Sequence, residues 1–495
     1  MSDKFHNYIA GEWRPAISGE WFENRNPAHW DEVIGLFPKS DKRDVDLAVA
    51  AAREAYKKWR LVPAPERGNI LKRAGDLMVE RKEALARDMT REMGKVLAET
   101  RGDVQEGIDT AYYAAVEGRR LFSHTTPSEM PNKMNLSFRM PVGVAGLISP
   151  WNFPMAIPCW KTLPALVCGN SVVFKPASDT PLTATHLVEI LAEAGIPKGV
   201  INIVHGGGGS VGNAIVDHPD VNLISFTGSS DIGKQINAKA GAMLKRVSLE
   251  LGGKNAQIVM EDADLSLALE GVLWGAFGTT GQRCTATSRL ILHEPIYDKF
   301  VAMLIEAVKK LQVGDGLDPR NNVGPVVNKG QIDTVAGYVE IGKKEGAKLL
   351  VGGHPLDDAG HKGGWFYAPT VFGEVKPKMR LFQEEIFGPV LSVARAKDFD
   401  EAVQMHNDCI YGLSSSIYTR DVNQAFRAIR DLEAGITYIN GATIGAECHM
   451  PFGGVKQTGN GHREGGWTVY EFFSEIKSVY VDFSGKLQRA QIDNY

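Results

Sequence analysis

The chain has 495 residues, 43% of them hydrophobic, which is enough to build roughly two to four globular domains. Its 55 lysines and arginines nearly balance 59 aspartates and glutamates, and a net charge of -4 creates no long-range field that would attract nucleic acid or an anionic membrane. The N-terminus carries no basic segment followed by an apolar one, and no apolar stretch is long enough to cross a bilayer. The sequence therefore predicts a cytoplasmic location.

The chain opens with two long helical patterns, at residues 45–61 and 66–93, in which apolar residues recur at helical spacing. From residue 142, short apolar runs alternate with helical patterns, as in a parallel sheet whose strands are buried on both faces. The predicted strands are residues 144–148, 171–174, 201–204 and 223–226, and the predicted helices between them are residues 158–168, 181–194 and 210–217. This alternation is typical of a nucleotide-binding α/β domain.

A second alternating series begins near residue 256 and predicts a second α/β domain. Its predicted strands are residues 257–260, 289–293, 348–351, 391–394, 415–418 and 436–439. Residues 135–140 and the run 472–482 read as strands outside either series. Such strands either pair with each other or extend the sheet of a second copy of the chain, which would make the protein an oligomer.

The five cysteines are odd in number and have no Cys-x-x-Cys spacing, so disulfides are not expected. The histidines are scattered without any close grouping of metal ligands, and we predict no metal site. Cys284 is the cysteine whose neighbours in the sequence are able to assist catalysis. Arg283 directly precedes it, and Glu250 lies upstream in a Leu-Glu-Leu-Gly-Gly run. A catalytic thiol needs such a cation or proton acceptor, whereas a free cysteine without one is usually buried and inert.

Glycine-rich turns follow two neighbouring predicted strands. Gly207, Gly209 and Gly212 have the Gly-x-Gly-x-x-Gly spacing that lets backbone amides approach a phosphate, although no acidic residue ends a strand about 20 positions later. The next turn contains Gly228 and Ser229 and also enters a helix. A plain glycine turn would explain either one alone, but two on adjacent strands favour phosphate binding.

The segment Pro-Trp-Asn-Phe-Pro at residues 150–154 follows another strand, at the sheet edge where α/β proteins place their ligands. It reads either as a rigid aromatic turn or as a loop that fixes the Asn152 amide as a donor to an oxyanion. Lys175, which closes the next strand, is compatible with a surface charge or with a contact to ribose hydroxyls.

Taken together, these segments closely resemble the NAD(P)-dependent aldehyde dehydrogenase superfamily over essentially the whole chain. The motifs that carry the resemblance are Pro-Trp-Asn-Phe-Pro, Phe-Lys-Pro at 174–176, Phe-Thr-Gly-Ser at 226–229, Leu-Glu-Leu-Gly-Gly at 249–253, Gly-Gln-Arg-Cys at 281–284, Glu-Glu-Ile-Phe-Gly-Pro at 384–389 and Pro-Phe-Gly-Gly at 451–454. The resemblance implies an α/β aldehyde dehydrogenase fold with a Rossmann-like NAD(P)-binding domain at 1–120 and 142–252, a catalytic domain at 253–452, and a small β oligomerisation element at 121–141 and 468–495.

The resemblance also implies an oxidation of an aldehyde to the acid. Cys284 would attack the aldehyde, the Asn152 amide and the Cys284 N–H would hold the oxyanion, and Glu250 would activate the water that hydrolyses the thioester. Lys161 and Glu464 fall where the family has residues proposed to relay the proton of the glutamate, and a salt bridge between them is an equally good reading.

For the cofactor, the resemblance implies NAD or NADP. It places Lys175 and Glu385 on the riboses, Ser229 on the pyrophosphate, and Trp151 and Phe387 against the nicotinamide half. The remaining cofactor-binding positions are Ile148, Gly212, Gly228, Leu251 and Ser178. Many NAD-preferring members carry glutamate at the position of Ser178, which repels the 2′-phosphate of NADP, so serine here predicts use of both cofactors.

The substrate is predicted to be a small, carboxylate-bearing semialdehyde, because Arg283 can pair with a carboxylate; a structural ion pair is the alternative. The sequence around Cys284 resembles both the antiquitin branch and the α-ketoglutaric semialdehyde dehydrogenases. In the antiquitin pattern Arg283 and the Gly445–Ala446 backbone would hold the carboxylate, and Glu106 would accept an amino group. Phe153 and Phe452 complete the predicted substrate-binding residues.

Three other functions are compatible with the motifs: a CoA-acylating enzyme, a broad-specificity enzyme and a non-catalytic relative. Glu250 argues against the CoA-acylating enzyme.

The sequence also leads us to expect a homodimer or homotetramer.

Overall fold

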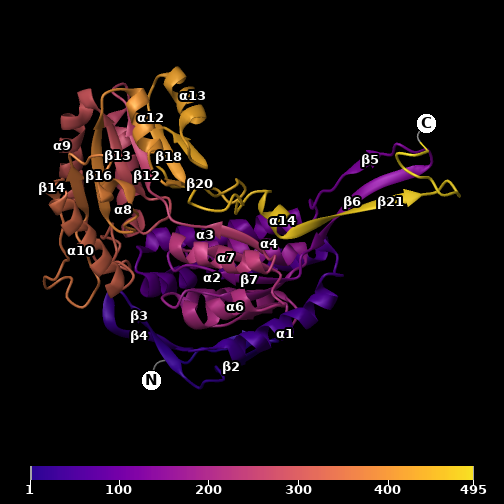
Figure 1. Ribbon diagram of the computed structural model, residues 1–495. Coiled ribbons are helices and arrows are strands. Elements are labelled where there is room, and N and C mark those ends of the chain that lie inside the picture. Colours follow the sequence, from indigo (N-terminus) through magenta and orange to yellow (C-terminus); the bar gives the residue numbers. More distant parts are fainter. Residues whose placement is uncertain (1–2, 494–495) are drawn as a thin grey trace.

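The computed structural model describes residues 3–493; residues 494–495 of the predicted oligomerisation element, and residues 1–2 of the predicted cofactor domain, lie outside it. Two α/β bodies lie side by side, and a long β-ribbon projects away from them (Figure 1). No helix within the described residues is long and apolar enough to cross a membrane.

The first body is built on a seven-stranded sheet of order β11-β10-β7-β8-β9-β1-β2. Its parallel strands are β7 (Val144–Ile148), β8 (Ser171–Lys175), β9 (Ile201–Ile203), β10 (Leu223–Thr227) and β11 (Arg246–Glu250), and β1 (Asn7–Ile9) and β2 (Glu12–Arg14) extend it antiparallel. The four predicted strands of this series are thus confirmed to within a residue at each end.

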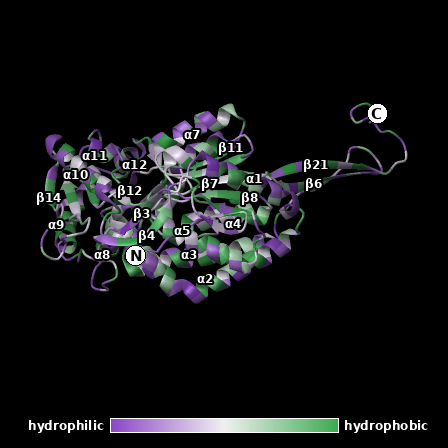
Figure 2. Cartoon of the chain, turned by 90° about the horizontal axis from the view of Figure 1, so that it is seen from below, coloured by the Kyte–Doolittle hydropathy of each residue, from purple (hydrophilic) through white to green (hydrophobic). Residues whose placement is uncertain are grey.

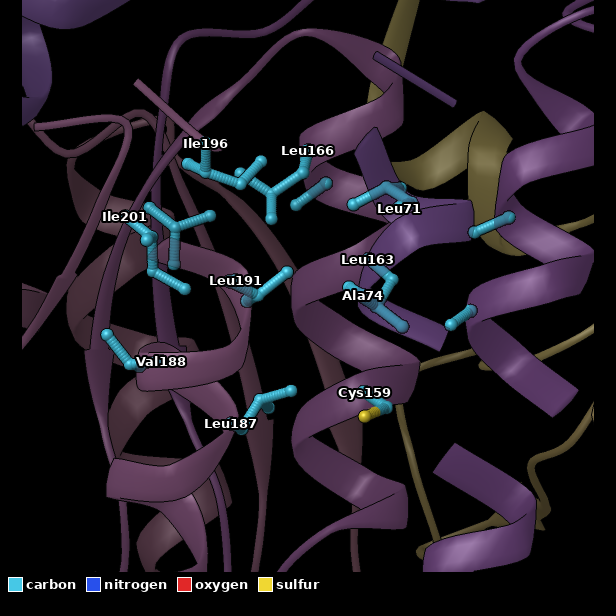
Figure 3. Packing of buried hydrophobic residues seen from close by; sticks show 14 of the residues in the cluster. Leu71, Ala74, Cys159, Leu163, Leu166, Leu187, Val188, Leu191, Ile196 and Ile201 are labelled. Carbon is cyan, nitrogen blue, oxygen red and sulfur yellow. The ribbon is translucent and has the colours of Figure 1, made fainter. Parts of the chain in front are cut away.

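Helices cover both faces of this sheet, which explains the continuous apolar runs of its strands. They are α1 (Lys42–Trp59), α2 (Ala64–Met93), α3 (Leu97–Glu117), α4 (Ala156–Cys168), α5 (Pro181–Ala194), α6 (Asn213–Asp217) and α7 (Ser230–Ala242). Alternate strand residues pack on the two faces: Leu147 and Val172 join the core formed with α2 to α5, whereas Ile148 and Val173 join the core formed with α1, α6 and α7. Figure 3 shows side chains of the first core, among them Leu163, Leu187 and Ile201.

The helix predictions need correction at several ends. The first pattern begins at Lys42 because Asp41 and Asp44 form a capping box, and it stops at Trp59. The predicted helix 210–217 is a π-helical turn, Gly208–Gly212, followed by the short α6. Helix α3, the N-terminal strands, β11 and a hairpin of β3 (Trp21–Asn26) and β4 (His29–Pro38) were not predicted.

The second body is a seven-stranded sheet of order β14-β15-β16-β13-β12-β18-β19. Its strands are β12 (Asn255–Val259), β13 (Thr287–His293), β14 (Lys348–Val351), β15 (Thr370–Gly373), β16 (Val390–Ala396), β18 (Ser414–Tyr418) and β19 (Ile436–Ile439). Its helices are α8 (Leu265–Phe277), α9 (Tyr297–Val308), α10 (Lys329–Lys344), α11 (Arg380–Gln383), α12 (Phe399–Asn407) and α13 (Val422–Asp431). All six predicted strands are present, and β15 was not predicted.

The β-ribbon joins segments from distant parts of the chain. Strand β6 (Lys133–Pro141) pairs antiparallel with β21 (Ser474–Asp482) over their whole lengths, and β5 (Thr125–Pro127) pairs with the other edge of β6. Figure 2 shows the ribbon extending away from both bodies. The predicted pairing of the two isolated strands is therefore confirmed. The short strands β17 (Tyr411–Gly412) and β20 (Val455–Lys456) pair with each other, and the short helix α14 (Val469–Phe472) directly precedes β21 of the ribbon.

Candidate active site

Cys284 lies where two cavities meet, between the carboxyl ends of the first sheet and the second body. Four residues line both cavities: Ile157, Thr227, Leu251 and Cys284. One cavity also contains Trp151, Asn152 and Phe387, and we call it the cofactor-side cavity. The other contains Glu106, Arg283 and Phe452, and we call it the substrate-side cavity.

The turn before Cys284 is held in an unusual backbone conformation. Thr279 and Thr280 adopt left-handed conformations with φ of 51° and 57°, which β-branched residues rarely tolerate. The Glu99 carboxylate accepts hydrogen bonds of 2.8 and 2.9 Å from the Thr279 N–H. At Gly281, a Cβ would lie 2.2 Å from the Gly388 carbonyl oxygen, so glycine is required there. The Glu99 side chain, which lies outside the motif, therefore helps to hold the turn before Cys284.

Burial, with the Glu385 and Glu250 carboxylates nearby, raises the pKa of the Cys284 thiol to about 12. The resting thiol is therefore protonated, and its conversion to a nucleophile requires a base. Arg283 lowers the thiol pKa, but by less than these effects raise it.

Glu250 ends strand β11 and is almost completely buried. Neither carboxylate oxygen has a hydrogen-bond partner among the described residues. Burial and the neighbouring Glu464 raise the pKa of the Glu250 carboxyl well above its ordinary value. An unpartnered carboxyl with a raised pKa in the same cavity as a protonated thiol has the properties of a general base.

Lys161 and Glu464 form a buried ion pair, as one of the two readings predicted. Ser225 joins it, accepting a 2.9 Å hydrogen bond from Lys161 Nζ and donating one of 3.1 Å to Glu464 Oε1. Because Glu464 also lines the substrate-side cavity with Glu250, the pair is placed to influence the charge of Glu250.

Asn152 is buried, and its Nδ2 donates a 3.1 Å hydrogen bond to the Gln282 carbonyl, two residues before Cys284. An amide nitrogen carries two hydrogens, so a second N–H is available to another acceptor. The bond ties the 150–154 loop directly to the nucleophile's turn.

The cofactor-side cavity contains both residues predicted to lie against the nicotinamide half, Trp151 and Phe387, and also Glu385, predicted on a ribose. Trp151 and Phe387 meet edge to face with ring centroids 5.3 Å apart. Glu385 accepts a 2.9 Å hydrogen bond from the Gly253 N–H, and burial raises its carboxyl pKa to about 7. The remaining predicted residues in this cavity are Gly228, Ser229 and Leu251.

A separate cavity has an apolar lining suited to an aromatic base. Ile148, Phe226 and Ile232 line it, together with Gly212 of the glycine-rich turn. Added Cβ atoms at Gly208 and Gly209 would meet no other atom within 4 Å, so the turn leaves open space beside the backbone. The glycine amides are suited to contact a phosphate, and the apolar cavity beside them is suited to an adenine ring, so together they are compatible with a dinucleotide.

Lys175 and Ser178 line neither of these cavities and lie at the end of β8. Burial lowers the pKa of Lys175 to about 8, and its Nζ donates a 2.7 Å hydrogen bond to the Pro176 carbonyl. The Ser178 hydroxyl donates to the Gly206 carbonyl at 3.2 Å, next to the glycine-rich turn.

The substrate-side cavity brings together all six predicted substrate residues: Glu106, Phe153, Arg283, Gly445, Ala446 and Phe452. Arg283 Nη2 lies 3.1 Å from Glu99 Oε1, and Nε donates to the Thr279 hydroxyl at 2.9 Å. Its guanidinium also lies over the Phe153 ring, 5.1 Å from the centroid. Arg283 thus makes a structural ion pair and lines the cavity as well.

Burial, with Asp103 nearby, raises the pKa of the Glu106 carboxyl to about 8. Sequence reasoning missed other residues in these cavities. Trp160, Ile157 and Leu413 line the substrate side, and Gln331 lines the cofactor side. Glu99 was missed as well, because nothing near it in the chain indicates that it would face Arg283.

Comparison with known proteins identifies the family. The model of the aldehyde dehydrogenase family matches residues 13–479, and the chain belongs to that family. It is an oxidoreductase that acts on the aldehyde group. The chain is 42% identical over 475 residues to the α-ketoglutaric semialdehyde dehydrogenase of Bacillus subtilis, covering 96% of this chain and 97% of that protein. It is 43% identical over 484 residues to the α-ketoglutarate semialdehyde dehydrogenase of Haloferax volcanii, covering 98% and 100%.

The crystal structure of betaine aldehyde dehydrogenase from Staphylococcus aureus in complex with NAD+ has the same fold, with a TM-score of 0.95 and 36% sequence identity. The match covers 97% of this chain and 96% of that one. The aldehyde dehydrogenase fold predicted from the motifs is therefore confirmed.

Proposed function

We propose that this enzyme oxidises the semialdehyde of α-ketoglutarate to the dicarboxylic acid, with NAD+ as the oxidant. The observation that carries the proposal is the guanidinium of Arg283 in one cavity with the Cys284 thiol, which suits a substrate with an aldehyde at one end and a carboxylate at the other. The names of the two semialdehyde-oxidising relatives support the same substrate class.

The Cys284 sulfur attacks the aldehyde carbon after Glu250 accepts the thiol proton, directly or through water. The Asn152 amide and the Cys284 N–H donate to the oxyanion that forms. When bound, the nicotinamide supplies the acceptor for the hydride of the resulting thiohemiacetal. Lys161 with Glu464 takes the thiol proton from Glu250, which leaves Glu250 ionised for the second step. Glu250 then removes a proton from the water whose oxygen attacks the thioester carbon, and the C–S bond breaks to release the acid and the Cys284 thiolate.

Trp151, Phe387 and Glu385 would hold the nicotinamide half of the cofactor, with Gly228, Ser229 and Leu251 beside them. Ile148 and Gly212 would hold the adenine half, with Lys175 and Ser178 on its ribose. Ser178 carries no charge that would repel a 2′-phosphate, so NADP+ is a second cofactor.

Glu106 distinguishes this substrate from an amino-bearing one. With a pKa of about 8, its carboxyl is mostly neutral at pH 7 and donates a hydrogen bond to a keto or carboxylate oxygen. That property favours a keto acid over the α-aminoadipic semialdehyde of the antiquitin pattern.

We further propose that residues 1–120 and 142–252 bind the cofactor, that residues 253–452 carry the catalytic cysteine, and that the β-ribbon joins copies of the chain. The ribbon supports this by exposing the large apolar side chains of Met134, Phe138, Ile476 and Tyr480.

The test is a set of aldehydes offered to the purified enzyme with each cofactor, with and without coenzyme A. We expect NADH formation, free acid as the product, and a kcat/KM for α-ketoglutaric semialdehyde at least about tenfold above that for pentanal, since a charged hydrogen bond contributes about 1.5–3 kcal/mol. Equal values for both aldehydes would contradict the substrate, an acyl-CoA product would identify a CoA-acylating enzyme, and activity in Cys284→Ala would overturn the mechanism.

A further inference from the structure

A fully buried ion pair lies behind the loop that carries Asn152. Lys95 Nζ is 2.6 Å from Asp103 Oδ2, and both side chains have 0% exposure. Lys95 occupies the turn between α2 and α3, and Asp103 lies in the second turn of α3. Neither residue lines the cofactor-side or the substrate-side cavity. Because burying two charges costs several kcal/mol, such a pair is weak evidence for stability by itself.

The remaining bonds of the pair all go to one loop. Lys95 Nζ donates to the Asn152 carbonyl at 3.0 Å, and Asp103 Oδ1 accepts from the Ala156 N–H at 2.7 Å. Lys95 Nζ also lies 3.9 Å from the centroid of the Phe153 ring, between those two anchor points. The ion pair therefore holds both ends of the segment 152–156.

The position of this segment determines where the Asn152 side chain points. Its Nδ2 bonds the Gln282 carbonyl in the turn of Cys284, so the backbone is anchored by Lys95 on one side and the side chain by the nucleophile's turn on the other. A donor that stabilises an oxyanion must be placed to within a fraction of an ångström before the reaction starts.

We infer that the Lys95–Asp103 ion pair positions the Asn152 amide for the oxyanion. Both are positioning residues that act through Asn152, and the inference rests on the proposed role of Asn152 as oxyanion donor. Loss of the pair frees the segment 152–156, while Cys284, Glu250 and the cofactor residues Glu385 and Phe387, which lie on other segments, stay in place. The defect then falls on kcat, because the oxyanion forms only during the reaction.

The test variant is Lys95→Met/Asp103→Asn, which removes both charges together and keeps an acceptor for the Ala156 N–H. We expect kcat to fall about 10- to 100-fold, with the KM values for aldehyde and NAD+ within about threefold of the unaltered enzyme, because a misplacement of about 1 Å costs up to about 100-fold. Arg101→Met is the matched control: Arg101 lies on α3, as Asp103 does, and its substitution removes an exposed ion pair with Glu83 of α2 and leaves kcat unchanged.

The decisive measurement repeats the double substitution in an Asn152→Ala background. Because the pair acts through Asn152, its removal there lowers kcat by less than about threefold. An undiminished kcat in the first variant, or an equally large loss in the Asn152→Ala background, overturns the inference.

Asn152→Ala alone tests the proposed function separately. It lowers kcat by about 100-fold or more if Asn152 holds the oxyanion, and a normal kcat removes that role and the inference with it. If the double variant does not fold, Lys95→Gln/Asp103→Asn, which also removes both charges but keeps polar side chains at both positions, serves in the same cycle with the same two outcomes.

Discussion

The two cavities that meet at Cys284 are built differently. The cofactor side is lined largely by small, aliphatic and aromatic residues, with Glu385 as its charged residue. The substrate side carries four charged residues: Glu106, Glu250, Arg283 and Glu464. Most residues of the cofactor side follow the ends of neighbouring parallel strands, β7, β10 and β11. Those of the substrate side come mostly from α3, α4, the turn at Cys284 and the segment 445–464, although Glu250 ends strand β11.

If the two cavities bind the cofactor and the substrate as proposed, the ligand shared by the family and the ligand specific to this member use different kinds of site. Strand ends are fixed by the sheet and suit a constant cofactor. A site collected from helices and loops changes with each substrate. If this view is right, substitutions on one side will change the kinetic constants for one ligand and leave those for the other unchanged.

The largest effect is expected for Glu250→Gln, which removes the base of the substrate side. We expect kcat to fall about 100- to 10,000-fold, the range of general-base catalysis, with KM for NAD+ unchanged. Because burial and Glu464 raise the pKa of Glu250, the wild-type kcat rises with pH as this carboxyl loses its proton, in a range above the ordinary glutamate pKa. The pH profile of kcat measures this increase, and we expect it to be absent from Glu250→Gln. If kcat of the variant rises with pH at the same midpoint, a group other than Glu250 causes the increase.

Arg283→Met comes next and separates charge recognition from catalysis. We expect KM for α-ketoglutaric semialdehyde to rise about 10- to 100-fold, while KM for pentanal and for NAD+ stays within about twofold, because a charged hydrogen bond contributes about 1.5–3 kcal/mol. Combining it with Glu99→Gln avoids leaving the Glu99 carboxylate without its ion-pair partner. If KM rises equally for both aldehydes, Arg283 has only a structural role.

On the cofactor side, Ser178→Glu should act on NADP+ alone. A carboxylate there repels the 2′-phosphate, and we expect KM for NADP+ to rise about tenfold or more, with KM for NAD+ and for aldehyde unchanged. Ser178→Gln is the control of the same shape without the charge. Steady-state kinetics with both cofactors decides between charge and size, and equal effects of the two variants would mean that size is responsible.

The smallest effect is expected for Glu106→Gln, which mimics the neutral carboxyl. Below a pH of about 8 the variant should match the unaltered enzyme within about threefold in KM for the semialdehyde, since the Glu106 carboxyl is then mostly protonated. Above that pH the ionised carboxylate repels the substrate carboxylate, and KM rises in the unaltered enzyme only. A pH series of KM values tests this, and a parallel rise in Glu106→Gln would exclude Glu106 as the cause.

Much of the fold is readable from the sequence, because strands buried on both faces form continuous apolar runs, as β7 and β12 do. Helix α3 was missed for the opposite reason: its inward face carries Thr100, Asp103 and Thr110, so the apolar periodicity is interrupted. One of these buried polar residues, Asp103, is also the residue that accepts the hydrogen bond from the Ala156 N–H and so helps to anchor the Asn152 loop.

The sequence by itself determined the family and predicted Cys284 as the nucleophile with Glu250 as its base, because these residues lie in short motifs whose chemistry is local. Only the tertiary structure decided that Glu99 holds Arg283 across 184 positions and that Lys95 and Asp103 anchor the Asn152 loop. The physical reason is that one helix, α3, supplies Glu99, Asp103 and Glu106. The packing of α3 against α4 and the turn at Cys284 depends on the whole core and not on the neighbours of these residues in the sequence.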